Sequence, residues 1–373
     1  MAMSANPTYV EHSRFYVTPL RSPPSDPSAP PTQVRYHYLD VRPTSTIPIK
    51  AHLLLLHGFP DTGAQAWNRL FGQLTSYGFR LIVPDLLGYG RTSSPTRAQG
   101  RLAEFGMRSM SVDLAGLLDH AKAGVGASVG APKWGGGETG GKVVVVAHDW
   151  GAGLAWKFVS VFPERVLGVA TICVPYMSPT SMSVPLNIVV EMLPNFGYQA
   201  FFADPRSTDI INTHLERFVK MVFVGPGLFP GVKRSSDWVK LGELEKYLTA
   251  KEDPPSGGVP LYTPEEQHAH IQFLKGKMDG PLNWYRTRDI NALEDEGQDD
   301  LDRNVTCPVL GLIPDKDSAL PKTMWENSSD QLPNFRSAEL QNCGHWAMLE
   351  QPARIGLEVD RWIREEILRK SSL

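Results

Sequence analysis

The chain has few cysteines, no long apolar run and no excess of one charge. Its cysteines, Cys173, Cys307 and Cys343, are too few and too widely spaced for a disulfide framework or a zinc site. No segment approaches the roughly 18 continuous apolar residues of a membrane-spanning helix. The 37 basic and 40 acidic residues give a net charge of −3, which favours neither nucleic acid nor an anionic membrane as a partner. These absences favour a soluble protein with a small neutral ligand.

Targeting patterns are also missing from the ends of the chain. The N-terminal stretch, "MAMSANPTYVEHSRFYV", has no basic region followed by an apolar segment, so we expect no signal peptide and a cytoplasmic location. The last three residues, "SSL", resemble the peroxisomal S-K-L signal but lack its central basic residue, which leaves peroxisomal import as a weaker alternative. We expect a monomer or a homodimer.

Strand-like runs alternate with helical patterns over most of the 373 residues. Several central strands are apolar on both faces, which predicts an α/β fold: a mostly parallel sheet flanked by helices, with two antiparallel strands at its start. The predicted strands are 14–17, 34–39, 52–56, 80–84, 142–147, 166–173, 308–313 and 336–341. The predicted helices are 63–78, 109–124, 151–162 and 353–370.

The alternation stops between 178 and 304, where helical patterns mix with aromatic residues, methionine and proline. An insertion of this size between two strands of one sheet predicts a helical cap over the carboxyl ends of the strands, where ligands bind in open α/β sheets. We therefore expect a first core part at 1–177, a cap at 178–304 and a second core part at 305–373. An unrelated helical interaction domain is the alternative.

Asp149 occupies the point where a valine strand turns into a helix, in "KVVVVAHDWGAG". Such an elbow exposes its apex residue above the sheet, and a carboxylate there can open a carbon centre by displacement to give an ester. The alternative role is a simple cap of the helix that follows. The motif G-x-S-x-G also occurs, around Ser128, but no strand precedes it, so we expect a surface loop there.

An ester on Asp149 would need a base to activate water and an acid to orient the base. His345, in "QNCGHW", follows the last predicted strand and is the only histidine near the C-terminus. Asp315 and Asp317 both follow the strand before it. The chain order nucleophile, acid, base agrees with either aspartate.

Four segments in this order resemble the hydrolase domain of soluble epoxide hydrolases, within the α/β-hydrolase fold. They are "LLLLHGFPDTGAQAWNRLFGQLTSYGFRLIVPDLLGYGRTSSP", "VVVVAHDWGAG", "NWYR" and "NCGHWAMLEQP". The resemblance implies that Asp317, directly after a lysine, is the acid. It also implies an oxyanion hole from the backbone N–H groups of Phe59 and Trp150, and a cis Phe59–Pro60 peptide bond. We expect Phe59, Pro60, Trp150 and Trp346 to line the pocket.

Epoxide opening leaves an alkoxide that needs a proton donor with a high pKa, and tyrosine, with a pKa of about 10, is suited to this. Tyr198, in "NFGYQAFF", and Tyr285, in "LNWYR", match the positions of the proton donors in the family. The resemblance thus implies an epoxide hydrolase that uses an epoxide and water and needs no cofactor and no metal. No second catalytic domain precedes the hydrolase segments in this sequence, so we expect the phosphatase half of the bifunctional vertebrate relatives to be absent.

Two other functions remain open at this stage. A haloalkane dehalogenase has the same fold and an aspartate nucleophile, but halide leaves without a proton, and that family lacks the tyrosine pair. A catalytically silent ligand-binding protein of the hydrolase fold belongs to another functional class. Activity toward epoxides and alkyl halides discriminates among the three.

Overall fold

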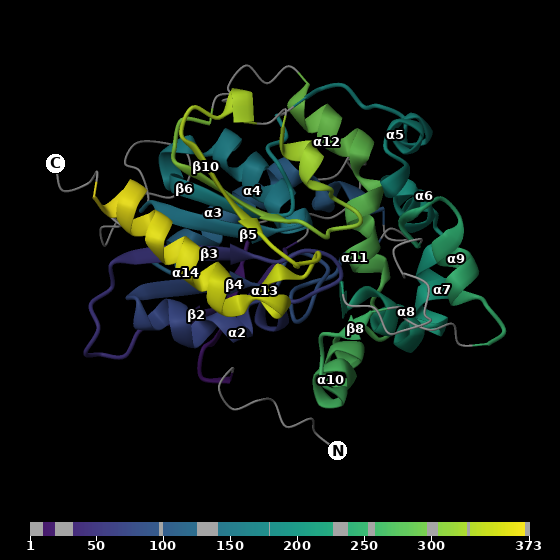
Figure 1. Ribbon diagram of the computed structural model, residues 1–373, viewed down its shortest axis with the longest axis horizontal. Helices are drawn as coiled ribbons and strands as arrows, with labels where there is room; N and C mark the ends of the chain where they lie inside the picture. The colour runs from purple at the N-terminus through teal and green to yellow at the C-terminus, as the bar shows by residue number, and fades with distance from the viewer. Residues whose placement is uncertain are drawn as a thin grey trace.

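The computed structural model describes residues 10–18, 33–96, 100–124, 141–178, 180–226, 238–252, 258–296, 305–326 and 329–369. Ser128, most of the glycine-rich segment around it and the C-terminal Ser-Ser-Leu lie outside these residues. The predictions made for those segments are therefore not examined by the structure. Figure 1 shows a sheet with helices on both faces and a group of further helices at one end.

The sheet is mostly parallel, as predicted, and within the described residues it has eight strands in the order β1-β2-β4-β3-β5-β6-β9-β10. All eight predicted runs form strands, each within two residues of its predicted bounds. The antiparallel pairs are β1 with β2 and β2 with β4. The strands are β1 (Ser13–Val17), β2 (Arg35–Val41), β3 (Ala51–Leu56), β4 (Phe79–Pro84), β5 (Val143–His148), β6 (Val166–Ile172), β9 (Val309–Pro314) and β10 (Phe335–Leu340).

Helices cover both faces of the sheet because its central strands are apolar on each side. Every residue of β5 is buried, and four consecutive valines suit a strand that packs against helices above and below. One group of helices contains α2 (Gly63–Ser76), α13 (Ala347–Glu350) and α14 (Pro352–Trp362). The other contains α3 (Met107–His120) and α4 (Trp150–Val161), which pack on each other.

The chain between β6 and β9 forms short helices that lie beyond one end of the sheet (Figure 1). They are α5 (Leu186–Met192), α6 (Gly197–Ala203), α7 (Ser207–Thr213), α8 (Leu215–Val222), α9 (Glu243–Leu248), α10 (Pro264–Leu274), α11 (Asp279–Asn283), the 3₁₀ turn η6 (Trp284–Arg286) and α12 (Arg288–Asp295). A small antiparallel pair, β7 (Val224–Gly225) and β8 (Val259–Pro260), was not predicted. We call this segment the cap; its boundaries at 178 and 304 stay a prediction.

A buried ion pair joins the cap to the core. Lys157 of α4 pairs with Asp295 of α12, and the two side chains are only 7% and 4% exposed. Replacing Asp295 with alanine should cost about 3–5 kcal/mol of unfolding free energy, because Lys157 would keep a buried charge without a partner. Denaturant unfolding measures this loss. Glu216→Ala, which breaks the exposed pair of Glu216 with Lys220, is the control and should cost no more than about 1 kcal/mol. Equal losses in the two variants would contradict the prediction.

Candidate active site

Asp149 lies at a strained turn between β5, which ends at His148, and α4, which begins at Trp150. Its backbone has φ 50° and ψ −125°, a conformation that costs a non-glycine residue about 1–3 kcal/mol. Two glycines make room for this turn. A Cβ atom on Gly58 would lie 2.4 Å from the Asp149 Cβ, and one on Gly151 would lie 2.4 Å from the His57 carbonyl oxygen. The sequence therefore folds here into an elbow that exposes a carboxylate at the carboxyl end of a central strand.

Backbone N–H groups hold one side of the Asp149 carboxylate. The Phe59 N–H, in the loop after β3, donates to Oδ1 over 2.8 Å, and the Trp150 N–H also hydrogen bonds to the carboxylate. These are the two donors that were predicted for an oxyanion hole. The Phe59–Pro60 peptide bond is cis, which confirms that prediction.

His345 and Asp317 form a hydrogen-bonded pair on the loops that follow β10 and β9. His345 Nδ1 lies 2.7 Å from Asp317 Oδ2, and Asp317 Oδ1 accepts the N–H groups of Ala319 and Leu320 over 2.9 and 3.0 Å. Asp315, the alternative acid, instead accepts the Cys343 N–H over 3.1 Å and pairs with Lys316. The geometry thus selects Asp317 as the partner of His345.

His345 faces Asp149 with its other nitrogen, because Nε2 lies 3.9 Å from Asp149 Oδ2. Burial disfavours the imidazolium, but the charges of Asp317 and Asp149 outweigh it and raise the pKa of His345 to about 9. Burial also raises the pKa of Asp149, although His345 and the backbone donors oppose this. The pKa of Asp317 is lowered because its hydrogen bonds and the His345 charge outweigh its burial.

His148 and Cys173 both hydrogen bond to the backbone carbonyl of His345. The His148 Nε2–H and the Cys173 thiol donate to the His345 carbonyl oxygen over 2.9 and 3.3 Å. Burial keeps the pKa of His148 well below its usual value, so the ring is neutral. His148, Cys173 and His345 also bring ligand-type atoms within 4.8 Å of one another in the described part of the chain. Hydrogen bonding to one carbonyl explains this group, and we assign no metal to it.

Tyr198 of α6 and Tyr285 of η6 are buried, with ring centroids 6.2 Å apart. Both line the same cavity as Asp149. Burial raises the pKa of each above its ordinary value, and the negative charge of Asp149 acts in the same direction. Both hydroxyls therefore stay protonated at neutral pH and are available as donors.

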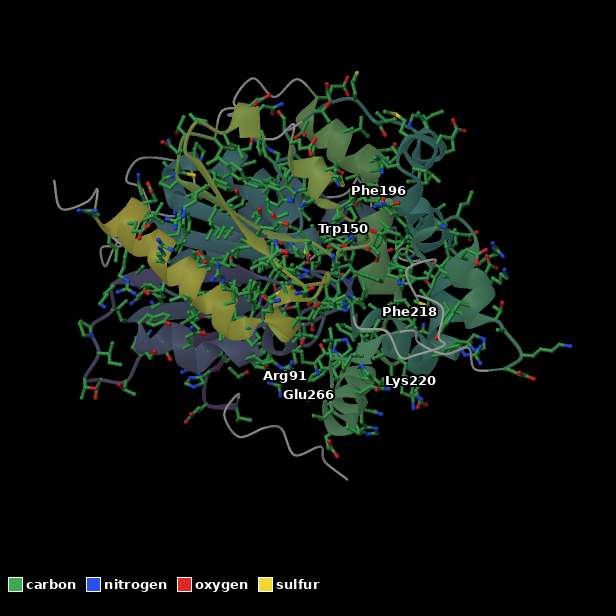
Figure 2. All side chains as sticks on the ribbon, in the orientation of Figure 1. Arg91, Trp150, Phe196, Phe218, Lys220 and Glu266 are labelled. Atoms are coloured by element: carbon green, nitrogen blue, oxygen red, sulfur yellow. The ribbon has the colours of Figure 1, made fainter. Side chains whose placement is uncertain are left out.

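The cavity has a volume of about 680 Å³ and lies between the core loops and the cap. It is aromatic on the cap side and polar near residues 315–318 and Asn342. Phe59 and Trp346 are among the residues that line it, and a pocket role for Pro60 and Trp150 stays a prediction. Pro60 is buried, and its carbonyl oxygen lies 2.9 Å from His270 Nε2. The Trp150 ring packs against Tyr285 at 5.1 Å, and Figure 2 shows it where the sheet meets the cap.

His270 lies next to no predicted strand or elbow, so the sequence alone indicates no functional role for it. The structure places it on the buried side of α10, one turn before Leu274, the other fully buried side chain of this helix. The spacing of four residues between His270 and Leu274 in a helical segment was the available signal. That spacing predicts a buried face and does not identify the contact that His270 makes.

The elbow after β5 and the Asp–His pair after β9 and β10 are the arrangement of an α/β hydrolase. The chain matches the model of the alpha/beta hydrolase family over residues 53–356, and it belongs to this family. It is 27% identical to the bifunctional epoxide hydrolase 2 of Rattus norvegicus, with 97% of this chain and 60% of that protein covered. It is 26% identical to the epoxide hydrolase srdG of Neurospora crassa, with 90% of this chain and 94% of that protein covered.

A solved structure shares the fold. The epoxide hydrolase A of Mycobacterium thermoresistibile superposes with a TM-score of 0.70 at 24% identity, covering 89% of this chain and 95% of that one. The chain spans less than two thirds of the rat and mouse bifunctional relatives, 60% and 57% of their lengths. No helix among the described residues is long and apolar enough to cross a membrane.

Proposed function

We propose that this protein is an epoxide hydrolase that adds water to an epoxide to give a vicinal diol through an ester on Asp149. The observation that carries the proposal is a carboxylate at the elbow that shares one cavity with two buried tyrosine hydroxyls. A carboxylate nucleophile suits displacement at carbon, and protonated phenols suit an alkoxide leaving group. The relatives at 25–27% identity, which are named epoxide hydrolases, add independent support.

In the first step Asp149 attacks a ring carbon and the ring C–O bond breaks. Oδ2 is the oxygen that attacks, because Oδ1 is held by the Phe59 N–H and stays in place as the carbonyl oxygen of the ester. The ring oxygen takes a proton from Tyr198 or Tyr285. The aromatic side of the cavity binds the apolar part of the epoxide.

In the second step water attacks the carbonyl carbon of the ester and His345 takes the proton. Ester formation removes the charge of Asp149, which is one of the charges that raise the pKa of His345. His345 therefore loses its proton more readily in the ester than in the free enzyme, where its pKa is about 9. The N–H groups of Phe59 and Trp150 stabilise the negative charge on Oδ1. Collapse of the intermediate breaks the ester C–O bond, and His345 returns its proton to the departing oxygen of the diol. The second proton of the water, left on the carboxyl group of Asp149, passes to the tyrosinate, which restores Asp149 and the tyrosine.

A panel of epoxides and haloalkanes tests the proposal. We expect diol from apolar epoxides, and halide release from haloalkanes that is slow compared with diol formation. In a single turnover in ¹⁸O-water the label should first enter the Asp149 carboxylate, because water attacks the ester carbonyl and not the ring carbon. Mass spectrometry of the diol and of the peptide that contains Asp149 locates the label.

The other outcomes identify the rival functions. Halide release without diol formation would identify a dehalogenase, and binding without turnover would identify a silent protein. Full label in the diol of the first turnover would exclude the ester. A cytoplasmic location and the choice between monomer and homodimer stay predictions.

A further inference from the structure

His270 connects the cap to the loop that carries the proposed oxyanion donor. Its ring is fully buried, and Nε2 lies 2.9 Å from the carbonyl oxygen of Pro60, 210 residues away in the sequence. Pro60 directly follows Phe59, whose N–H donates to Asp149. The cap thus contacts the backbone of the loop at residues 57–62, called the oxyanion loop below, through the buried side chain of His270.

The proton on the His270 ring can be assigned from its neighbours. A carbonyl oxygen only accepts, so Nε2 carries the proton and donates to Pro60. Burial lowers the pKa of His270 to about 3, which leaves the ring neutral and Nδ1 with a lone pair. The atom placed against Nδ1 is Gln65 Oε1, so this tautomer requires the amide to be flipped, with its NH₂ group toward the ring. Gln65 and Pro60 therefore fix one tautomer.

The oxyanion loop is held from the core and from the cap. On the core side, His57 Nδ1 donates to the Gly58 carbonyl oxygen over 2.9 Å, and the Asp61 N–H donates to the same oxygen over 3.0 Å. On the cap side, His270 holds the Pro60 carbonyl. A buried carbonyl that loses its donor is costly, so without His270 this peptide would turn toward another donor or toward water. That movement would carry the Phe59 N–H with it.

The helix that carries His270 is itself anchored to the core. Thr263 and Glu266 form a capping box at the start of α10, and Arg69 of α2 pairs with Glu266 at 3.1 Å. Glu266 is labelled in Figure 2, at the side of α10 nearest the core. The His270 ring also packs against Phe223 at 4.7 Å, and Phe223 packs against Trp346, the neighbour of His345, at 4.3 Å.

We propose that His270 is a positioning residue for the oxyanion hole, which holds the Pro60 carbonyl from the cap and thereby keeps the Phe59 N–H aimed at Asp149. The inference rests on the proposed ester mechanism. The proposed role predicts different effects on ester formation and on ester hydrolysis, because negative charge develops on Asp149 Oδ1 only while the ester is hydrolysed. Loss of His270 should therefore slow hydrolysis of the ester and leave its formation largely intact.

The test compares His270→Met with His270→Gln in single-turnover experiments that follow ester formation and ester hydrolysis separately. Methionine and glutamine have similar shapes, but only glutamine offers an N–H to the Pro60 carbonyl. Complete loss of an oxyanion donor costs about 10²–10³-fold, so its displacement in His270→Met should slow ester hydrolysis by about 10–10²-fold. Ester formation should change by less than about threefold, because it needs no oxyanion stabilisation. His270→Gln should recover most of the loss.

Exposed His268 on the same helix gives the matched control, and His268→Met should leave both rates unchanged. If His270→Met does not fold, the comparison of His270→Gln with His270→Asn replaces it. Asparagine is too short to reach the Pro60 carbonyl, so ester hydrolysis should be slower in His270→Asn than in His270→Gln. Equal rates of ester hydrolysis in the two compared variants would refute the role of His270. Ester formation and ester hydrolysis that are slowed equally, and that His270→Gln does not restore, would also refute it. Absence of an ester in the parent enzyme would instead refute the proposed function, and this inference with it.

Discussion

Replacing His345 with glutamine should stop the enzyme at the ester, with a covalent adduct of the epoxide on Asp149. Attack on the ring needs only the ionised carboxylate and a proton donor, whereas hydrolysis needs the base. A positioned base contributes about 10²–10⁴-fold, so the hydrolysis rate of His345→Gln should fall by that factor while the ester still forms. Intact-protein mass spectrometry should show a mass increase equal to that of the epoxide, and peptide mapping should place it on Asp149.

The pH dependence of the parent enzyme provides a second check on the same base. Burial opposes the imidazolium, but Asp317 and Asp149 raise the pKa of His345 to about 9 in the free enzyme, and this pKa falls once Asp149 is esterified. A base acts only when it is deprotonated, so the hydrolysis rate should rise with pH through the lowered pKa. His345→Gln should lose this rise.

The control for trapping is Asp149→Asn, which should form no adduct and no diol because the amide is a poor nucleophile. Unfolding measurements on both variants separate loss of the base from loss of structure. If folded His345→Gln accumulates no adduct, or accumulates it on another residue, the ester on Asp149 is wrong. An adduct that hydrolyses at the parent rate would leave the ester in place but remove His345 from the role of base.

The sequence predicted the framework of the site because its core residues follow strands that are easily recognised. Asp149 comes directly after β5 and His345 lies on the loop after β10, and the carboxyl ends of parallel strands meet at one edge of the sheet. Local pattern could not separate Asp315 from Asp317, which both follow β9. That choice depended first on the resemblance and then on the 2.7 Å contact with His345.

The contacts between the cap and the core could not be predicted from the sequence. Pro60 and Trp150 are the sequence neighbours of Phe59 and Asp149, but tertiary packing decides where a side chain points, and the Trp150 ring packs against Tyr285. His270 is the opposite case, because its place in the sequence does not indicate its contact with the oxyanion loop. It is distant from every motif in the sequence and touches the oxyanion loop only because α10 packs against α2 and the loop before it.

Replacing both Tyr198 and Tyr285 with phenylalanine should reduce epoxide opening by about 10²–10⁴-fold, the usual contribution of a positioned proton donor. The change removes two hydroxyls and keeps the rings, which pack against each other and, for Tyr285, against Phe59 and Phe202. Each single variant should retain partial activity, because the remaining hydroxyl can still protonate the ring oxygen. The rate of ester formation with an apolar epoxide is the quantity to measure.

An alkyl halide provides the sharpest control for this double variant, because halide departs without a proton. Any halide displacement that the parent enzyme shows should survive the loss of both hydroxyls, while epoxide opening is nearly abolished. Tyr77→Phe, on the distant end of α2, should leave both reactions unchanged. Epoxide opening near the parent rate in the double variant would remove the tyrosines from the mechanism and reopen the dehalogenase alternative, since a carboxylate at the elbow serves both reactions and only the proton donors distinguish them.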